Sequence, residues 1–574
     1  MNDKEDGARG WADAWIALAL ALYSLGIAIW LLANDIRLTQ EDGFYYFKIA
    51  QNVAAGLGST FDEVNPTNGY HPLWLLCLVP LFWLSSTPTA ILPLIGLMQA
   101  IFMAAGVVLL YYTARLSAGR YAASFAGLLW LWFVYRVSLG GLEFSLHALC
   151  LLASAYLYLR WFGANLPQPR QGLGLGVLLG LTFLARLDTL LLALIIWVWL
   201  FGRELKRGLG PTGIQRFLAV GGPVALVSLI YLGLNLALFG HPLPVSSMIK
   251  RTWSASLLAH DPRYLADGWL AAKVYLLSWP LFQFRRLYPF YLALGVFGAG
   301  SSGLIGLGLP RNHWLRQWLG ARAPFILFSL ANFLVYGLLY HGGLSFPPWY
   351  FVVQPWLAAL LIGELVDKIV LPWVAALPAR LRVLTQDGLK QPQEAQSPGL
   401  LTSSSSGPSS WAQLRWLVVI GFVALWSVAP FYTARSLEQW RARERLNRSP
   451  DRPLLEAAQW AGANLPPEAI IGAWNAGHIG YLSGRRVVNL DGVVNSWDYY
   501  LAGRHDLCRY WQAQKISHLV DVFEGEQALS VAPTYPTYAD CAGRLDLLWA
   551  NDRYNASWSV KVYKIAPVGK ITSN

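Results

Sequence analysis

The feature that most constrains this chain is a series of long apolar runs separated by short polar loops. The first run, Trp11–Ala33, reads "WADAWIALALALYSLGIAIWLLA" and contains one charged residue, Asp13. A helix needs roughly 20 apolar residues to cross a hydrocarbon core about 30 Å thick. Within lipid, only helices and closed barrels satisfy their own backbone hydrogen bonds. These runs therefore predict a polytopic α-helical membrane protein.

Further apolar runs of this length recur along the chain. The clear ones are Gly213–Phe239, Tyr288–Leu309, Pro324–Tyr340, Phe351–Leu371 and Trp411–Tyr432. Others, some interrupted by charge, are Pro72–Tyr112, Tyr121–Tyr135, Ser145–Trp161 and Leu173–Phe201. Together they predict about 11 crossings. The interruptions at Arg136–Glu143 and Arg186–Asp188 predict short half-helices that line a cavity, because irregular backbone at membrane depth is tolerated only there.

Basic residues are concentrated in the loops between these runs. The chain has 44 Lys and Arg against 32 Asp and Glu, a net charge of +12. Three loops contain Arg203, Lys206 and Arg207; Arg311, Arg316 and Arg322; and Arg380, Arg382 and Lys390. Cytoplasmic loops carry such an excess, so the charge predicts topology and gives no reason to expect a nucleic acid partner. The alternation places the loops at 34–71 and 241–286, and everything after 435, on the outer side.

The C-terminal part has a soluble composition. A flexible Gln386–Ser410 linker containing "TSSSSGPSS" precedes the last apolar run, which divides the chain into a membrane domain at 1–435 and a second domain at 436–574. In the second domain "EAIIGAW", "RRVVNLDG", "ISHLVDVF" and "SVKVYKI" predict strands, "LCRYWQAQ" predicts a helix, and "AGHIGYLSG" predicts a short helical or looped connection. We therefore expect a small α/β domain. This domain contains two cysteines, Cys508 and Cys541, which is the number needed for one disulfide outside the cytoplasm.

Two adjacent acids, Glu41 and Asp42, open the first outer loop. They precede "GFYYFKIAQNVAAG", whose apolar spacing predicts an interfacial helix with the acids at its N-terminus. One acid can then face a cavity while its neighbour is held elsewhere, and an ionised carboxylate there can accept a proton from a hydroxyl group. The simpler interpretation is a pair of solvated loop residues. After the turn at Asn68-Gly69, the residues Tyr70, His71 and Trp74 fit an aromatic belt or a substrate site equally well.

The segment "EDGFYYFKIAQNVAAGLGSTFDEVNPTNGYHPLW" resembles the first extracytoplasmic loop of the GT-C superfamily, polytopic glycosyltransferases that use polyprenyl-phosphate sugars. It is most similar to bacterial members of the arabinofuranosyltransferase-like and mannosyltransferase-like groups. Other similar segments are "GGLEFSLHALCLLASAYLY", "LARLDTLLL", "NLALFGHPLPVSSMIK" and "GAWNAGHIGYLSGRRVVNLDGVVN". The resemblance implies a GT-C fold with about 11 transmembrane helices and a C-terminal α/β domain.

The resemblance also implies a catalytic base. In that superfamily it is an acid of the first outer loop, which corresponds to Glu41 and Asp42 here. The family pattern usually begins with two Asp residues, so Glu41 departs from it. We therefore favour Asp42 as the base, with Glu41 as its partner.

A lipid-phosphate donor implies cations near the outer face. Candidates for the phosphate are Arg186, Lys250, Arg251, His71 and Lys48, with Arg136 and His341 as further basic residues on that side. Arg186 stands out because a charge within an apolar stretch is expensive unless it is paired or functional. A structural pair with Asp188 explains it as well. Candidates for sugar or acceptor binding are Glu143, Asp188, Tyr70, Trp74, His241, His341, His478 and Asp491, for each of which a purely structural role is the alternative.

The predicted function is transfer of a sugar from a polyprenyl-phosphate donor to an acceptor hydroxyl on a glycan, glycolipid or protein, with inversion. It would take place on the outer face of a bacterial inner membrane, without a cofactor or with help from a divalent cation. No cluster with zinc-ligand spacing is visible in the sequence. The alternative from another class is a flippase or transporter of lipid-linked sugars, although the internal repeats expected of a transporter are not apparent. A non-catalytic scaffold of an envelope complex is a third interpretation.

Overall fold

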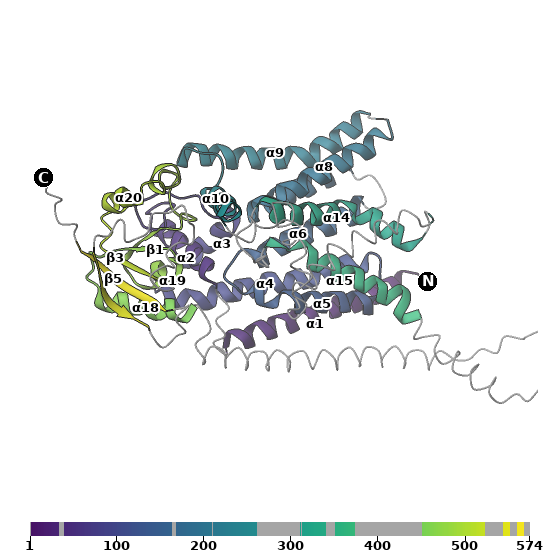
Figure 1. The fold of residues 1–574 in the computed structure, drawn as a ribbon. Helices are drawn as coiled ribbons and strands as arrows, with labels where there is room; N and C mark the ends of the chain where they lie inside the picture. The colour runs from purple at the N-terminus through teal and green to yellow at the C-terminus, as the bar shows by residue number, and fades with distance from the viewer. Residues whose placement is uncertain are drawn as a thin grey trace, which may run out of the picture.

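The computed structural model describes residues 2–33, 40–85, 87–162, 168–208, 210–260, 310, 313–339, 350–372, 451–522, 544–551 and 559–566. A bundle of long helices occupies most of the molecule, and a sheet domain lies at one end of it (Figure 1). The predicted runs Tyr288–Leu309 and Trp411–Tyr432, the Gln386–Ser410 linker, and the residues His341 and Cys541 are outside these ranges. The number of crossings therefore stays a prediction.

The helices of the bundle and its loops follow the predicted runs. They are α1 (Asn2–Ala33), α2 (Glu41–Ala54), α3 (Pro72–Phe82), α4 (Pro88–Arg115), α5 (Arg120–Ser138), α6 (Phe144–Phe162), α7 (Pro169–Ala185), α8 (Leu190–Leu205), α9 (Pro211–Phe239), α10 (Val245–His260), α14 (Trp314–Leu339) and α15 (Val353–Leu365), which the π-helical turn η4 (Val366–Val370) continues. Within the described ranges, four segments are long and apolar enough to cross a membrane: Gly10–Ala33, Pro88–Arg115, Pro211–Phe239 and Trp314–Tyr336. This confirms an integral membrane protein rich in helix.

Two predicted interruptions of the bundle are present, but the predicted short half-helices are not, because the flanking helices α5, α6, α7 and α8 have 19, 19, 17 and 16 residues and α5 continues through Arg136. The run at 173–201 is divided into α7 and α8 by Arg186, whose backbone is extended (φ −160°, ψ 116°), and by the short 3₁₀ helix η1 (Leu187–Thr189). The second interruption lies between α5 and α6, where Gly141 adopts a left-handed φ of 80°. The run at 72–112 is also divided, into α3 and α4, because Pro88 starts a new helix and the residue before a proline is biased away from helical backbone.

The C-terminal part is the predicted α/β domain. Its elements are α18 (Asp451–Asn464), β1 (Ile470–Ala473), α19 (Gly477–Leu482), β2 (Arg486–Asn489), the π-helical turn η5 (Tyr499–Gly503), α20 (Leu507–Gln514), β3 (His518–Val522), β4 (Arg544–Ala550) and β5 (Val560–Ala566). The strand order is β2-β1-β3-β5-β4, with β1 parallel to β2 and β3, and β5 antiparallel to β3 and β4. Four predicted strands and both predicted helical segments are confirmed; α18 and β4 were not predicted. Cys508 is disulfide-bonded.

Helix α2 joins the two parts of the molecule. One apolar cluster contains residues of α2, α3 and the sheet domain together. The Phe44 ring lies 4.2 Å from the His478 ring on α19, and the Phe47 ring lies 5.8 Å from the Tyr481 ring. The first loop and the sheet domain therefore lie at the same end of the bundle, opposite the N-terminus (Figure 1).

Candidate active site

A cavity lies where the first loop, the bundle and the sheet domain meet. Its polar lining comes from four separate parts of the chain. The lining residues are Asp42, Tyr45, Tyr46, Ile49, Gly69, Tyr70, His71, Leu142, Glu143, Ser246, Lys250, Tyr350, Val493 and Val494. Several of the residues predicted from the sequence meet in this cavity.

Helix α2 contributes one face to this cavity. Asp42, Tyr45, Tyr46 and Ile49 follow the i, i+3, i+4, i+7 spacing that places side chains on one side of a helix. The two tyrosines were not predicted as site residues, although this spacing from Asp42 was a signal that could have identified them.

The two adjacent acids have different surroundings. Glu41 points to the sheet domain, where its carboxylate accepts hydrogen bonds from the backbone N–H of Gly477 at 2.5 Å and of His478 at 3.3 Å and pairs with the His478 ring. Asp42 is half-buried and lines the cavity. The sequence left open which acid faces the cavity, and the geometry singles out Asp42.

The surroundings of Asp42 change its basicity. Burial raises the pKa of its carboxyl, and the negative charges of Glu41 and Glu143 raise it further, while Lys250 acts in the opposite direction. A carboxylate with a raised pKa is a stronger base than an ordinary aspartate.

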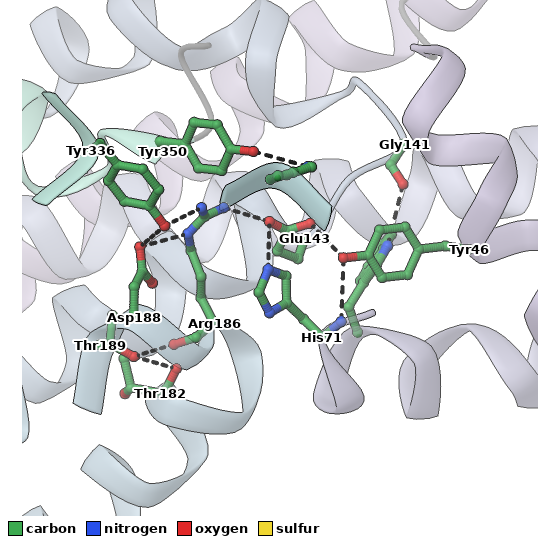
Figure 2. A network of polar contacts seen from close by, with 12 residues as sticks. Tyr46, His71, Gly141, Glu143, Thr182, Arg186, Asp188, Thr189, Tyr336 and Tyr350 are labelled. Atoms are coloured by element: carbon green, nitrogen blue, oxygen red, sulfur yellow. Dashed lines mark hydrogen bonds and ion pairs between the residues drawn. The ribbon is translucent and has the colours of Figure 1, made fainter. Parts of the chain in front are cut away.

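A buried polar network supports the cavity from the bundle side (Figure 2). Glu143 accepts a hydrogen bond from Arg186 Nη1 at 2.6 Å and from the Tyr46 hydroxyl at 3.2 Å, and its carboxylate lies 3.6 Å from His71 Nε2. Burial lowers the pKa of His71 to about 4, so its ring is neutral at physiological pH. His71 therefore brings no positive charge to the cavity.

Arg186 is enclosed by this network. Its Nε donates to Asp188 at 3.1 Å, its Nη2 donates to the Tyr336 hydroxyl at 3.1 Å, and its guanidinium lies over the Tyr350 ring at 4.7 Å. The side chain is 1% exposed and does not line the cavity. The structural pair with Asp188, one of the two interpretations of the sequence, is therefore present.

Lys250 is the lysine that lines the cavity. Its Nζ donates to the Tyr350 hydroxyl at 3.0 Å and lies 5.6 Å from the centre of that ring. Burial alone would lower its pKa, but Tyr350 and the Asp42 charge outweigh this effect and raise it, so Lys250 is a cation. Ser246 and Tyr350, which also line the cavity, carried no signal in the sequence.

The turn at Asn68-Gly69 places the start of α10. The Asn68 side chain donates to Asn235 Oδ1 at 2.7 Å and accepts from the Val245 N–H at 2.9 Å. Because Val245 begins α10, this contact fixes the helix that presents Lys250.

The same turn packs directly against the sheet domain. A Cβ built on Gly69 would lie 2.0 Å from the Val493 carbonyl oxygen, so no larger residue fits there without a shift. Val493 and Val494 form the cavity wall on this side.

The remaining predicted residues lie away from the cavity lining or behind it. Trp74 is buried and donates to the Gly141 carbonyl at 3.2 Å, Lys48 pairs with Glu63 at 2.9 Å, and Arg251 is exposed on α10. The His241 ring stacks on Trp497 at 4.0 Å.

Asp188 is held by Arg186 and by the Tyr336 hydroxyl at 2.6 Å, and Asp491 lies behind Tyr45. The side chain of Arg136 is outside the described residues, as is His341. Their binding roles stay predictions.

A family model described as "Domain of unknown function (DUF8728)" matches residues 438–563, which is the sheet domain alone. No curated protein is similar enough to this sequence to count as a match.

Two solved structures have the same fold over most of the chain. ArnT from Cupriavidus metallidurans bound to undecaprenyl phosphate has a TM-score of 0.51 at 16% identity, over 98% of this chain and 99% of that one. The Archaeoglobus fulgidus oligosaccharyltransferase in complex with Zn and sulfate has a TM-score of 0.51 at 14% identity, over 88% of this chain and 67% of that one. The chain has the GT-C fold. In this GT-C fold, residues of both the bundle and the sheet domain line the cavity.

The sequence prediction allowed help from a divalent cation. Among the residues that the structure describes, no group of three or more His, Cys, Asp or Glu side chains is arranged to hold a metal ion.

Proposed function

We propose that this protein is an integral-membrane glycosyltransferase that transfers a sugar from a polyprenyl-phosphate donor to an acceptor hydroxyl. One observation carries the proposal: a carboxylate of raised pKa, Asp42, and a cation, Lys250, line the same cavity. One group suits proton removal and the other suits a phosphate leaving group, which are the two needs of this reaction. The undecaprenyl phosphate held by ArnT, which has the same fold, supports the donor class.

In the proposed reaction Asp42 is the general base. Its ionised carboxylate takes the proton from the acceptor hydroxyl while the hydroxyl oxygen attacks the anomeric carbon of the donor sugar. The bond from that carbon to the phosphate oxygen breaks, and its electron pair leaves with the polyprenyl phosphate. Attack on the side opposite the leaving phosphate gives inversion. The proton remains on Asp42 until it is passed to solvent.

Lys250 is the phosphate-binding cation of this proposal. It reaches the cavity, whereas the charge of Arg186 lies between two carboxylates. The Tyr350 hydroxyl orients the Lys250 ammonium, and Arg186 holds Glu143. Arg186 is therefore a supporting residue in this mechanism.

The proposed site faces the extracytoplasmic side of a bacterial inner membrane. The sheet domain, whose residues help to line the cavity, lies at one end of the bundle, while the α8–α9 connection lies toward the other (Figure 1). That connection contains Lys206 and Arg207 and follows Arg203. Basic loops favour the cytoplasm, which puts the cavity outside. The same orientation would suit a flippase of lipid-linked sugars, which is the alternative function, but a flippase needs no base in its cavity.

A turnover assay tests this function. Purified full-length protein is mixed with a panel of radiolabelled polyprenyl-phosphate sugars and an acceptor extract, and release of polyprenyl phosphate is measured. We expect release by the wild type, its abolition in Asp42→Asn and partial retention in Glu41→Gln. Absence of release with every donor, from wild-type protein shown to be folded, would overturn the proposal and favour a transporter or scaffold.

A further inference from the structure

Asp491 of the sheet domain contacts the helix that carries Asp42. Its Oδ2 lies 3.1 Å from the Tyr45 hydroxyl, and its Oδ1 accepts from the Val493 N–H at 2.7 Å. The Tyr45 hydroxyl also lies 3.2 Å from the Trp474 carbonyl oxygen. The Asn489 side chain, at the end of β2, donates to the same hydroxyl at 3.5 Å. Tyr45 is therefore held by three groups of the sheet domain.

Asp491 does not itself line the cavity. Its side chain is buried, and Tyr45 stands between it and the space that Asp42 faces. The sequence predicted Asp491 as a substrate-binding residue, whereas this arrangement gives it contact with another side chain. Asp491 contacts two residues that do line the cavity, Tyr45 and Val493.

Tyr45 is one helical turn along α2 from Asp42. Residues i and i+3 of a helix share a face, so fixing the Tyr45 side chain also fixes the rotational setting of the face that carries Asp42. Misplacing a catalytic group by about 1 Å can reduce the rate about 100-fold. The contact between Asp491 and Tyr45 is therefore in a position to influence the reaction.

The turn that contains Asp491 also forms the cavity wall. Val493 and Val494 follow Asp491 directly, and the Val493 carbonyl touches Gly69. Burial raises the pKa of Asp491 to about 7, and the Val493 N–H and the Tyr45 hydroxyl counteract this by stabilising its charged form. The same two hydrogen bonds thus hold together the wall, the carboxylate and α2.

We propose that Asp491 is a positioning residue for the base: by holding the Tyr45 hydroxyl, it sets the face of α2 that presents Asp42 against the wall formed by Val493 and Val494. This inference rests on the proposed function. It also gives a role to the sheet domain, which matches a family of unknown function: the domain completes and orients the active site.

The kinetic test uses four variants of the full-length protein in the turnover assay: Asp491→Asn, Asp491→Leu, Tyr45→Phe and the double variant Asp491→Leu/Tyr45→Phe. We expect Asp491→Leu to lower kcat about tenfold or more while KM for the donor changes less than about threefold, because orientation is lost and donor contacts remain. Asp491→Asn keeps an oxygen that accepts from Tyr45 and should recover most of the activity. The double variant should lose less activity than the product of the two single losses, because the two changes share the contact between Asp491 and Tyr45.

The matched control is Asp498→Asn, which removes an exposed carboxylate from the same domain. It should leave kcat and KM unchanged. Wild-type kcat in Asp491→Leu and Tyr45→Phe, or losses that multiply in the double variant, would overturn the positioning role while leaving the proposed function intact.

Hydrogen exchange of α2 separates this inference from a failure of the proposed function, because it needs no substrate. In Asp491→Leu and Tyr45→Phe we expect faster exchange of the backbone amides at Tyr45–Ile49, and in Asp498→Asn we expect no change. Unchanged exchange in both site variants overturns the inference even if no donor is ever turned over. If exchange is faster in the two variants but the wild type turns over no donor, the contact holds α2 as inferred and the proposed function is rejected.

Discussion

Glu41 and Asp42 are adjacent in the sequence, but their carboxylates serve different surfaces. Glu41 accepts hydrogen bonds from the backbone N–H groups of Gly477 and His478 at the start of α19, whereas Asp42 faces the cavity. One turn of α2 thus binds the sheet domain and also presents the proposed base. Substitution of Glu41 should therefore mainly lower stability, and substitution of Asp42 should mainly lower activity.

Replacement of Glu41 should destabilise the protein more than replacement of Asp42. Glu41→Ala leaves two N–H groups and the His478 ring without their acceptor, which costs about 1–3 kcal/mol. The raised pKa of Asp42 means that its charged form is less favourable in the folded protein than in the unfolded chain. Asp42→Asn removes this charge, so the unfolding free energy should stay the same or rise. Thermal unfolding of the purified variants measures both effects. A lower Tm for Asp42→Asn than for Glu41→Ala would contradict the assignment.

The activity should depend on pH through Asp42. The base must be ionised, so activity is present above its pKa and is lost as the pH falls through it. Because burial raises this pKa, the acid limb of kcat/KM should lie above the ordinary aspartate pKa of about 3.9. The measurement is a pH profile of kcat/KM for the best donor of the panel.

A second variant checks the origin of that acid limb. His71 has a pKa of about 4 and is already neutral over the working range. His71→Gln should therefore keep an acid limb at the same pH, whatever its effect on the maximal rate. Disappearance of the acid limb in His71→Gln would show that His71 titrates there and that Asp42 does not.

Local sequence signals explain why helix α2 could be predicted and why much of the site could not. The acids at the N-terminus of α2 and its apolar spacing lie within a single segment of the chain, and so does the turn at Asn68-Gly69. The meeting of Asp42 with Lys250 and Tyr350 joins three distant segments, and nothing in the sequence encodes that proximity directly. Arg186 shows the limit most clearly, because a buried ion pair and a phosphate site both place an arginine in an apolar stretch.

Lys250 and Arg186 should respond differently to substitution. Lys250→Ala removes the proposed phosphate contact and should raise KM for the donor about tenfold or more, since hydrogen bonds to charged groups contribute about 1.5–3 kcal/mol. Lys250→Arg should recover part of the loss. Arg186→Ala leaves the buried Glu143 and the half-buried Asp188 without their cation, so we expect a loss of about 3–5 kcal/mol in stability.

Donor titrations and thermal unfolding of the same samples distinguish the two roles. A raised donor KM in Arg186→Ala at unchanged Tm would show that Arg186 binds the phosphate after all. Donor kinetics in Lys250→Ala that equal the wild type would remove Lys250 from the site.

Gly69 should tolerate no side chain, because its turn packs on the cavity wall. A Cβ at this position would lie 2.0 Å from the Val493 carbonyl oxygen and 3.2 Å from Val494 Cα, so the wall has to move. The clash involves backbone atoms, which cannot swing away as the end of a flexible side chain can. Gly69→Ala should therefore displace the sheet domain from the first loop and lower kcat/KM by about tenfold or more, with a lower Tm.

The matched control for this prediction is Gly202→Ala on α8, where an added Cβ meets nothing within 4 Å. Because alanine has a higher helix propensity than glycine, this control should keep its activity and its Tm should not fall. Protease cleavage between the bundle and the sheet domain reports the displacement directly and should become faster in Gly69→Ala alone. If Gly69→Ala retained the activity, Tm and cleavage rate of the wild type, the sheet domain would not form the wall of a working cavity, and the role given to Val493 and Val494 would have to be abandoned.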